Sequence, residues 1–128
     1  MDAYYEVRDD YLYAKLTGMF TSSDARHFSF ECVKKAHSHA LNRILCDITL
    51  VAGYDDQVPT MTRFDLSKFI VKTLPRGFML AVLETPRQCV GSRFDENVMV
   101  NRGASVKVTP NLPEALEWLD VTSGDKLS

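Results

Sequence analysis

Two short and almost continuously apolar segments constrain this chain more than any other feature. They are residues 43–48 (RILCDI) and 77–84 (GFMLAVLE), and a stretch with helical periodicity follows each of them. A strand that is apolar on both sides is typical of a parallel sheet whose two faces are both covered by helices. Parallel neighbours need crossover connections, which the intervening helical stretches would supply. These segments therefore predict an α/β fold.

The first twenty residues predict a β-hairpin. Residues 3–8 (AYYEVR) and 11–16 (YLYAKL) read as strands, and the polar pair Asp9-Asp10 between them suits a tight turn. Apolar side chains alternate with others along the second strand, which is the pattern of a strand with one buried face. The alternating apolar residues are Leu12, Ala14 and Leu16.

The first and the last of the four segments with helical periodicity each follow a capping residue. Thr21 precedes the first segment, with Asp24 at capping-box spacing, and Asn111 precedes the last; such side chains accept hydrogen bonds from free amides at a helix start. The first segment carries one apolar stripe at three- and four-residue spacing. Its members are Ala25, Phe28, Cys32, Ala36 and Ala40.

The two middle helical segments carry capping-box spacings. One runs from Thr62 to Asp65, and the other runs from Thr85 to Gln88, before a helix that we expect Gly103 to close. The apolar positions expected to face the core are Met61, Phe64, Ile70, Val71 and Leu74 in the first of these helices and Val90, Phe94 and Val98 in the second.

With residues 104–108 as a last strand, the element order is β-β-α-β-α-β-α-β-α. This order predicts one domain over residues 1–120, with a mostly parallel, mixed five-stranded sheet and packed helices, and a flexible tail at 121–128. The net charge of −2 argues against nucleic-acid binding, and no apolar run reaches the length of a membrane span. We expect a cytoplasmic protein.

Motifs for catalysis or for metal and cofactor binding are missing from the sequence. It contains no glycine-rich phosphate loop, no GxSxG elbow and no CxxC pair. His37 and His39 are two residues apart, so on a helix their rings point about 200° apart and cannot share one ion. Cys32, Cys46 and Cys89 lie among apolar neighbours and are expected to be reduced, buried thiols. We therefore predict no catalytic residue, no metal and no cofactor.

The segment TLVAGYDDQVPT, residues 49–60, is the best candidate for a binding site. It follows a central strand, and ligand sites in open α/β sheets lie beyond the carboxyl ends of such strands. It combines a glycine, an aromatic ring and two adjacent carboxylates. The candidate binding residues, including the start of the next helix, are Gly53, Tyr54, Asp55, Asp56, Thr60, Met61, Thr62 and Phe64.

The chain as a whole resembles the STAS or SpoIIAA-like family, named for sulfate transporters and bacterial anti-sigma-factor antagonists. The resemblance extends over residues 3–120 and rests on YLYAKLTGMFTSSDARHF, on RILCDI with the loop and helix after it, and on FDENVMVNRGASVKVTPNLPEALEWL. It implies a bacterial regulatory domain that binds a protein partner. In the antagonists a Ser or Thr in a D-S-S-G-like motif is phosphorylated, but here the loop reads GYDDQVPTMT, so the resemblance does not imply that switch.

Three functions are therefore considered. The first is a non-catalytic protein-binding module that acts through the second helix and the loop before it, with Tyr11 and Tyr13 as a further surface for homodimer formation. The second, implied by a similarity to SEC14-like domains, is a carrier of an apolar or lipid-like ligand. The third is a small enzyme that uses Asp55, Asp56 or a thiol. The carrier would need a cavity lined by residues such as Met61, Phe64, Phe69 and Met79.

Overall fold

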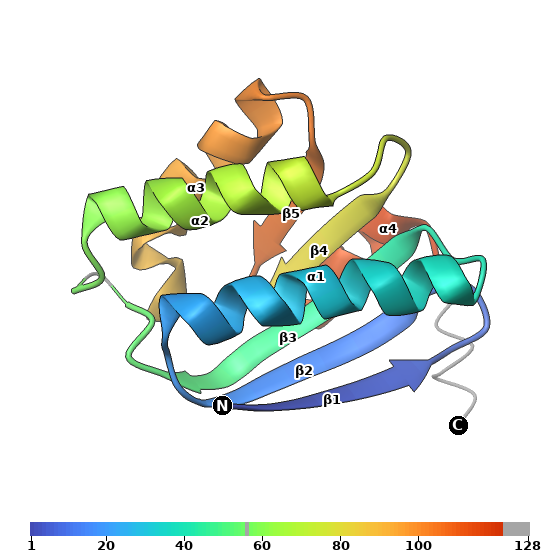
Figure 1. Cartoon of the computed structure of the whole chain (residues 1–128), viewed down its shortest axis with the longest axis horizontal. Coiled ribbons are helices and arrows are strands. Elements are labelled where there is room, and N and C mark those ends of the chain that lie inside the picture. Colours follow the sequence, from blue (N-terminus) through green and yellow to red (C-terminus); the bar gives the residue numbers. More distant parts are fainter. Residues whose placement is uncertain (56, 122–128) are drawn as a thin grey trace.

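A computed structural model describes residues 1–55 and 57–121 of the chain, and five strands and four α-helices account for most of them (Figure 1). The strands are β1 (Asp2–Val7), β2 (Leu12–Met19), β3 (Arg43–Ala52), β4 (Met79–Leu83) and β5 (Ser105–Thr109). The helices are α1 (Ser22–Ser38), α2 (Thr60–Thr73), α3 (Ser92–Asn101) and α4 (Leu112–Leu119), with the 3-10 helix η1 (Gln88–Gly91) directly before α3.

The sheet has the strand order β1-β2-β3-β4-β5, with β1 antiparallel to β2 and every other pair parallel. Helices α1, α2 and α3 lie on one side of the sheet, and α4 lies on the other (Figure 1). The predicted α/β architecture with a mostly parallel five-stranded sheet is therefore confirmed. No helix among the described residues combines the length and apolar character needed to cross a membrane.

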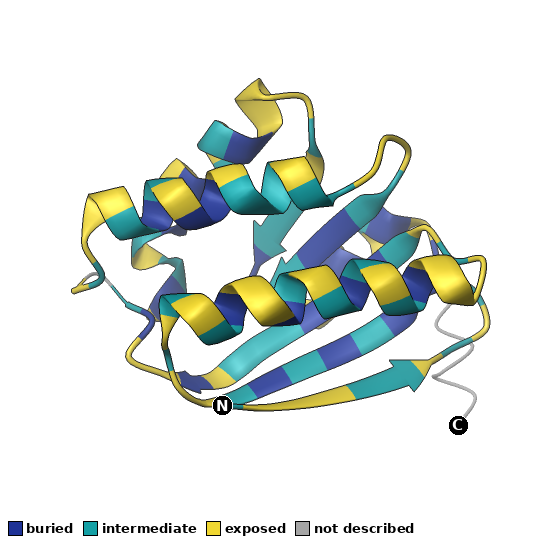
Figure 2. Ribbon diagram, in the orientation of Figure 1, coloured by how far each residue is buried: buried dark blue, intermediate teal, exposed yellow. Residues whose placement is uncertain are grey.

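The core has two parts because the sheet separates the helices. Leu12, Ala14 and Leu16 belong to the part beneath α1, α2 and α3, as their alternation predicts. In β3, Ile44 contributes to the same part, whereas Leu45 contributes to the part beneath α4. The burial colours of Figure 2 show the result: the outer sides of α1 and α2 are exposed, and buried residues lie among intermediate ones along β2, β3 and β4.

Strand β3 is four residues longer than its apolar segment predicts. It continues to Ala52 because the end of β2 pairs with it, for example Gly18 with Val51 and Met19 with Ala52. The candidate loop therefore begins only at Gly53.

The first and last α-helices begin as predicted. The Thr21 hydroxyl accepts a hydrogen bond from the Asp24 amide at 3.1 Å, and the Asn111 side chain accepts one from the Glu114 amide at 2.9 Å. Gly103 follows α3 with a φ of 91°, in the left-handed region that favours glycine at this position.

The start of α2 was predicted wrongly. The helix begins at Thr60 with Pro59 at the N-cap position, so Thr62 lies inside it and forms no capping box. Its buried residues are Arg63, Leu66 and Ser67, whereas Met61 is exposed. Ile70, Val71 and Leu74 pack against the core as expected, so the predicted stripe fails at the start of the helix, where the charged side chain of Arg63 is buried instead.

The predicted third helix is also different in detail. Thr85 and Gln88 do form the reciprocal hydrogen bonds of a capping box, at 3.1 and 2.8 Å, but these bonds precede the 3-10 helix η1, and α3 starts only at Ser92. The expectation that Val90 and Phe94 face the core is wrong, because both side chains are exposed while Ser92, Asp95 and Met99 are buried.

The face under α4 buries Tyr11, which was expected to be exposed. Its ring packs with Leu45, Ala81 and Leu119, so Tyr11 cannot serve as a surface for self-association. Val121 joins the same cluster, and the rest of the expected tail, residues 122–128, lies outside the described residues.

Candidate functional site

The candidate loop sends its residues in different directions. Gly53 has a φ of 82°, which favours glycine, and it turns the chain away from β3. Tyr54 then points inward and is buried. Asp55 stays at the surface and forms a local turn, because its Oδ1 accepts a hydrogen bond from the Gln57 amide at 2.9 Å. Asp56 lies outside the described residues, so a paired-carboxylate site is not described here.

Tyr54 belongs to a buried group that we call the Arg63 cluster, made of Tyr54, Arg63 and Asp95. The Tyr54 hydroxyl donates to Asp95 Oδ2 at 2.8 Å, and Arg63 Nη1 donates to the same oxygen at 2.7 Å. The Arg63 guanidinium also lies 4.5 Å from the centre of the Tyr54 ring, and its Nη2 donates to the Asp55 carbonyl oxygen. The cluster thus joins the loop, α2 and α3.

Gly91 makes room for the Arg63 side chain. A Cβ atom at this position would lie 2.9 Å from the Arg63 Cζ, closer than ordinary packing allows. The backbone of Gly91 is in the right-handed region, which any residue can adopt. Glycine is therefore needed here to let the Arg63 side chain approach the backbone, and not for an unusual backbone conformation.

Glu84 is a second buried carboxyl group, next to the Arg63 cluster. It follows β4 directly and its side chain accepts a hydrogen bond from the Ser92 hydroxyl at 2.5 Å. Burial raises the pKa of Glu84 to about 7, and the hydrogen bonds from Ser92 and Cys89 only partly oppose that shift. Burial also raises the pKa of Asp95, against the hydrogen bond from Tyr54 and the charge of Arg63.

Gln88 fixes the end of β3 beside these groups. Its Nε2 donates to the carbonyl oxygens of Ile48 and Val51, at 2.8 and 3.0 Å. Its Oε1 also accepts a hydrogen bond from the Thr85 amide. Gln88 therefore ties the segment between β4 and α3 to β3, the strand that precedes the candidate loop.

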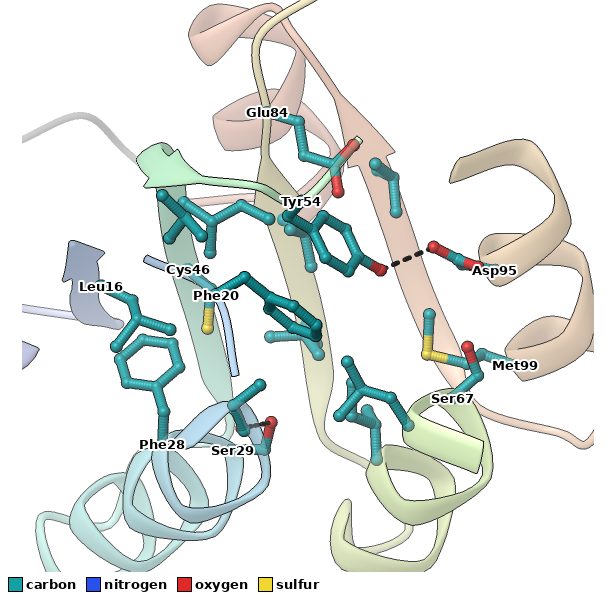
Figure 3. A pocket seen from close by; sticks show the side chains of 18 residues that line it. Leu16, Phe20, Phe28, Ser29, Cys46, Tyr54, Ser67, Glu84, Asp95 and Met99 are labelled. Atoms are coloured by element: carbon teal, nitrogen blue, oxygen red, sulfur yellow. Dashed lines mark hydrogen bonds between the residues drawn. The ribbon is translucent and has the colours of Figure 1, made fainter. Parts of the chain in front are cut away.

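The buried carboxyl groups lie at the wall of a cavity of about 90 Å³, which we call the α1–α3 cavity. Figure 3 shows Tyr54, Glu84 and Asp95 toward one side of it and the apolar Leu16 and Phe28 toward the other. The remaining wall is mostly apolar and comes from the sheet and from all three helices. It comprises Phe20, Ala25, Ser29, Cys46, Ile48, Val51, Leu66, Ser67, Ile70, Leu80, Val82, Met99 and Val108.

The cavity does not have the lining that the sequence predicted. Met61 is exposed to solvent, Met79 packs on the α4 side of the sheet, and neither Phe64 nor Phe69 lines the cavity. The half-buried Phe64 ring instead lies between two cations, 5.1 Å from Lys68 Nζ and 5.6 Å from Arg102 Cζ.

The remaining predicted binding residues surround the start of α2. Thr60 and Met61 are exposed and Thr62 is half-buried. The predicted binding residues are therefore not brought together: Thr60, Met61 and Thr62 lie at the surface at the start of α2, whereas Tyr54 points into the core.

Arg63, Glu84 and Asp95 were not identified from the sequence. Arg63, Leu66, Ser67 and Ile70 have the i, i+3, i+4, i+7 spacing of one helix face, so the signal was present but included polar members. A search restricted to apolar residues passes over such a face. For Glu84, its position at the carboxyl end of a buried strand was the available signal.

The cysteines are free, as predicted, but their burial differs. Cys32 and Cys46 are buried with their Sγ atoms 3.8 Å apart, whereas Cys89 is half-buried. Burial raises the pKa of Cys32, and burial together with nearby Glu84 raises the pKa of Cys89 to about 11. Both groups are therefore thiols at neutral pH, not reactive thiolates. Among the described residues, no three His, Cys, Asp or Glu side chains are grouped to hold a metal ion.

Comparison with solved structures shows which known fold this is. An anti-sigma factor antagonist from Mycobacterium paratuberculosis aligns with a TM-score of 0.59 and 11% identity, covering 93% of each chain. The protein TM1081 aligns with a TM-score of 0.55 and 16% identity, covering 92% of this chain and 88% of the other. The chain therefore has the SpoIIAA-like fold of STAS domains, and the resemblance seen in the sequence is confirmed for the fold.

The sequence itself gives no comparable match. No family model matches it, and a search of curated proteins returns no significant match.

Proposed function

We propose that this protein is a non-catalytic regulatory module that binds a protein partner through the start of α2 and the neighbouring surface of η1 and α3. The observation that carries the proposal is a set of exposed apolar side chains on these elements. Met61 is 66% exposed, Val90 is 68% exposed and Phe94 is 40% exposed. Such side chains gain stability when a partner removes them from water.

The fold supports the same class of function. One structural neighbour is an anti-sigma factor antagonist, a protein whose name implies that it acts by binding another protein. In this chain Thr60 and Thr62 are the hydroxyls nearest the loop, without the D-S-S-G-like motif. We therefore propose partner binding without the phosphorylation switch of that family.

The chemistry of the described groups favours binding over catalysis. The Asp55 carboxylate accepts the Gln57 amide hydrogen bond of a local turn, and the thiols of Cys32 and Cys89 have raised pKa values. Glu84 has a pKa near neutrality, but Ser92, the serine that contacts it, is fully buried and donates a hydrogen bond to its carboxyl group. These groups offer an enzyme no activated nucleophile.

The experiment is quantitative affinity capture from the source cells with the full chain, with its M61D variant and with F30D as matched control. Phe30 is a 51% exposed aromatic on the outer side of α1, so F30D places the same charge on another helix. We expect wild type and F30D to retain the same partner and M61D to lose it at least about tenfold, because a carboxylate would replace an apolar contact.

A partner retained equally by all three chains would place the binding surface elsewhere on the molecule. A partner lost equally from M61D and F30D would show a general effect of added charge. Either result contradicts the proposal.

The cavity favours a small ligand over the lipid-like ligand of the carrier hypothesis. Its volume of about 90 Å³ is smaller than the roughly 150 Å³ of an engineered cavity that holds one benzene molecule. A lipid acyl chain would require the helices to move apart.

A further inference from the structure

The α1–α3 cavity combines an apolar wall with an incompletely bonded carboxylate. Asp95 is 4% exposed, lines the cavity, and points from α3 toward Tyr54 and into the ring of lining side chains (Figure 3). Its Oδ2 accepts two hydrogen bonds, from Tyr54 and Arg63, whereas its buried Oδ1 has no partner among the described residues. A buried acceptor left in this state is costly, so it favours a ligand that brings a donor.

The charges at this end of the cavity favour a cationic donor. Glu84 and Asp95 both line the cavity, and Arg63 is the cation that faces them. The other groups that face Glu84 are Ser92 of α3 and Cys89 of η1, and neither carries a positive charge. When both carboxyl groups are ionised, the group therefore has one negative charge in excess, in surroundings where burial makes that charge costly.

The cavity also limits the size of its ligand. A benzene molecule occupies an engineered cavity of about 150 Å³, and the α1–α3 cavity measures about 90 Å³. A chain of at most about four carbons with one polar group has fewer non-hydrogen atoms than benzene and can bend to follow the cavity wall, which a rigid ring or a longer acyl chain cannot do. The apolar end of the wall, near Leu16 and Phe28, would receive the hydrocarbon part (Figure 3).

We propose that the α1–α3 cavity binds a small primary alkylammonium ion, with its ammonium group donating hydrogen bonds to Asp95 Oδ1 and Glu84 and its alkyl chain against Leu16 and Phe28. The ammonium group supplies the donor that Asp95 lacks and neutralises the excess negative charge. The inference is independent of the proposed partner binding, because the cavity wall and the exposed side chains of α2 and α3 are different residues.

The test is an NMR titration of the full chain at about pH 8, above the pKa of about 7 for Glu84, with n-butylammonium chloride, n-butanol and sodium butyrate as probes. These probes have similar alkyl parts and differ in the charge of the polar group. We expect n-butylammonium to bind saturably and at least about tenfold more tightly than n-butanol, with the amide signals around the cavity shifting, because charged hydrogen bonds are stronger than neutral ones. Butyrate should not bind.

Two serine variants show whether the cavity is the site. Ser29 of α1 lines the cavity and Ser38 of the same helix is exposed, and each hydroxyl donates to a carbonyl oxygen of the preceding turn at 2.9 Å. S29L places a larger side chain at the cavity wall and should weaken n-butylammonium binding at least about tenfold, whereas S38L should leave it unchanged. Amide signal dispersion confirms that each variant is folded.

The E84Q variant tests the charge. It keeps the shape of Glu84 and removes one negative charge, so we expect n-butylammonium to bind about tenfold more weakly and n-butanol to bind as before. Absence of saturable binding, equal affinity for n-butylammonium and n-butanol, equal effects of S29L and S38L, or no effect of E84Q would each overturn the proposal.

Discussion

The two faces of the sheet carry the same three residue types in similar arrangements. On the α2–α3 side, the Arg63 cluster joins Tyr54 to Asp95 at 2.8 Å with a guanidinium 4.5 Å from the ring centre. On the α4 side, Tyr13 donates to Asp47 at 2.9 Å with the Arg8 guanidinium 4.7 Å from its ring centre. We call Arg8, Tyr13 and Asp47 the Tyr13 cluster.

The two clusters differ mainly in burial. The residues of the Arg63 cluster are buried, and those of the Tyr13 cluster are half-buried. Burial together with the Asp47 hydrogen bond raises the pKa of Tyr13 to about 12, and the pKa of the more deeply buried Tyr54 is raised further. The hydrogen bond from tyrosine to aspartate, which both clusters contain, should therefore matter more in the Arg63 cluster, since water cannot replace a partner that is removed there.

The largest expected difference is between the D95N and D47N variants. D95N leaves the buried Arg63 without its ion-pair partner, and we expect the free energy of unfolding to fall by about 3 kcal/mol. D47N removes a charge that is closer to water, where we expect a loss of about 1 kcal/mol. Urea denaturation measures the loss of unfolding free energy in both variants. Equal losses would show that burial does not make the Arg63 cluster more important for stability than the Tyr13 cluster.

The pH dependence of stability sharpens the comparison on the buried side. The pKa of Glu84 is about 7 in the folded protein against 4.5 as its ordinary value, so its contribution to stability is full below the ordinary value and is lost as the pH rises through 7. We expect the wild type to lose on the order of 2.5 kcal/mol between about pH 5 and pH 8 through this group. E84Q should lack this loss, and a parallel decline in both proteins on urea denaturation would contradict the assignment to Glu84.

A smaller difference is expected between the Y54F and Y13F variants. Y54F removes a donor to the buried Asp95, which should cost about 2 kcal/mol of unfolding free energy. Y13F removes the corresponding donor to Asp47 at a half-buried position, where the expected loss is about 0.5 kcal/mol. Thermal unfolding of the two variants in one buffer measures both losses of unfolding free energy. Equal losses would show that water does not replace the missing hydrogen bond at Tyr13, against the prediction.

The fold was predictable because it depends on patterns that the sequence shows directly. Leu12, Ala14 and Leu16 alternate as a strand with one buried face, and Thr21 and Asn111 cap helices by local hydrogen bonds. These signals involve residues within a few positions of one another, so no knowledge of the tertiary structure is needed to read them.

The candidate site was less predictable because it depends on contacts between distant segments. Arg63 is buried only because Asp95, Tyr54 and Gly91 are brought next to it by the packing of α2 on α3. An apolar pattern cannot anticipate a buried charge that a distant residue neutralises. The sequence prediction therefore put Met61 and Phe94 on the buried faces of α2 and α3 and left out Arg63 and Asp95. Tyr54 was identified from its place in the loop, but its partner was not.

The most direct measurement of this account is the titration of the Glu84 side-chain carboxyl carbon by NMR in the full chain. The account holds that two buried carboxyl groups share one guanidinium at the end of the α1–α3 cavity, and it predicts a pKa of about 7 for Glu84. A pKa near the ordinary value of 4.5 would show that Glu84 is solvated or separately neutralised, and would contradict the described electrostatics of the buried face.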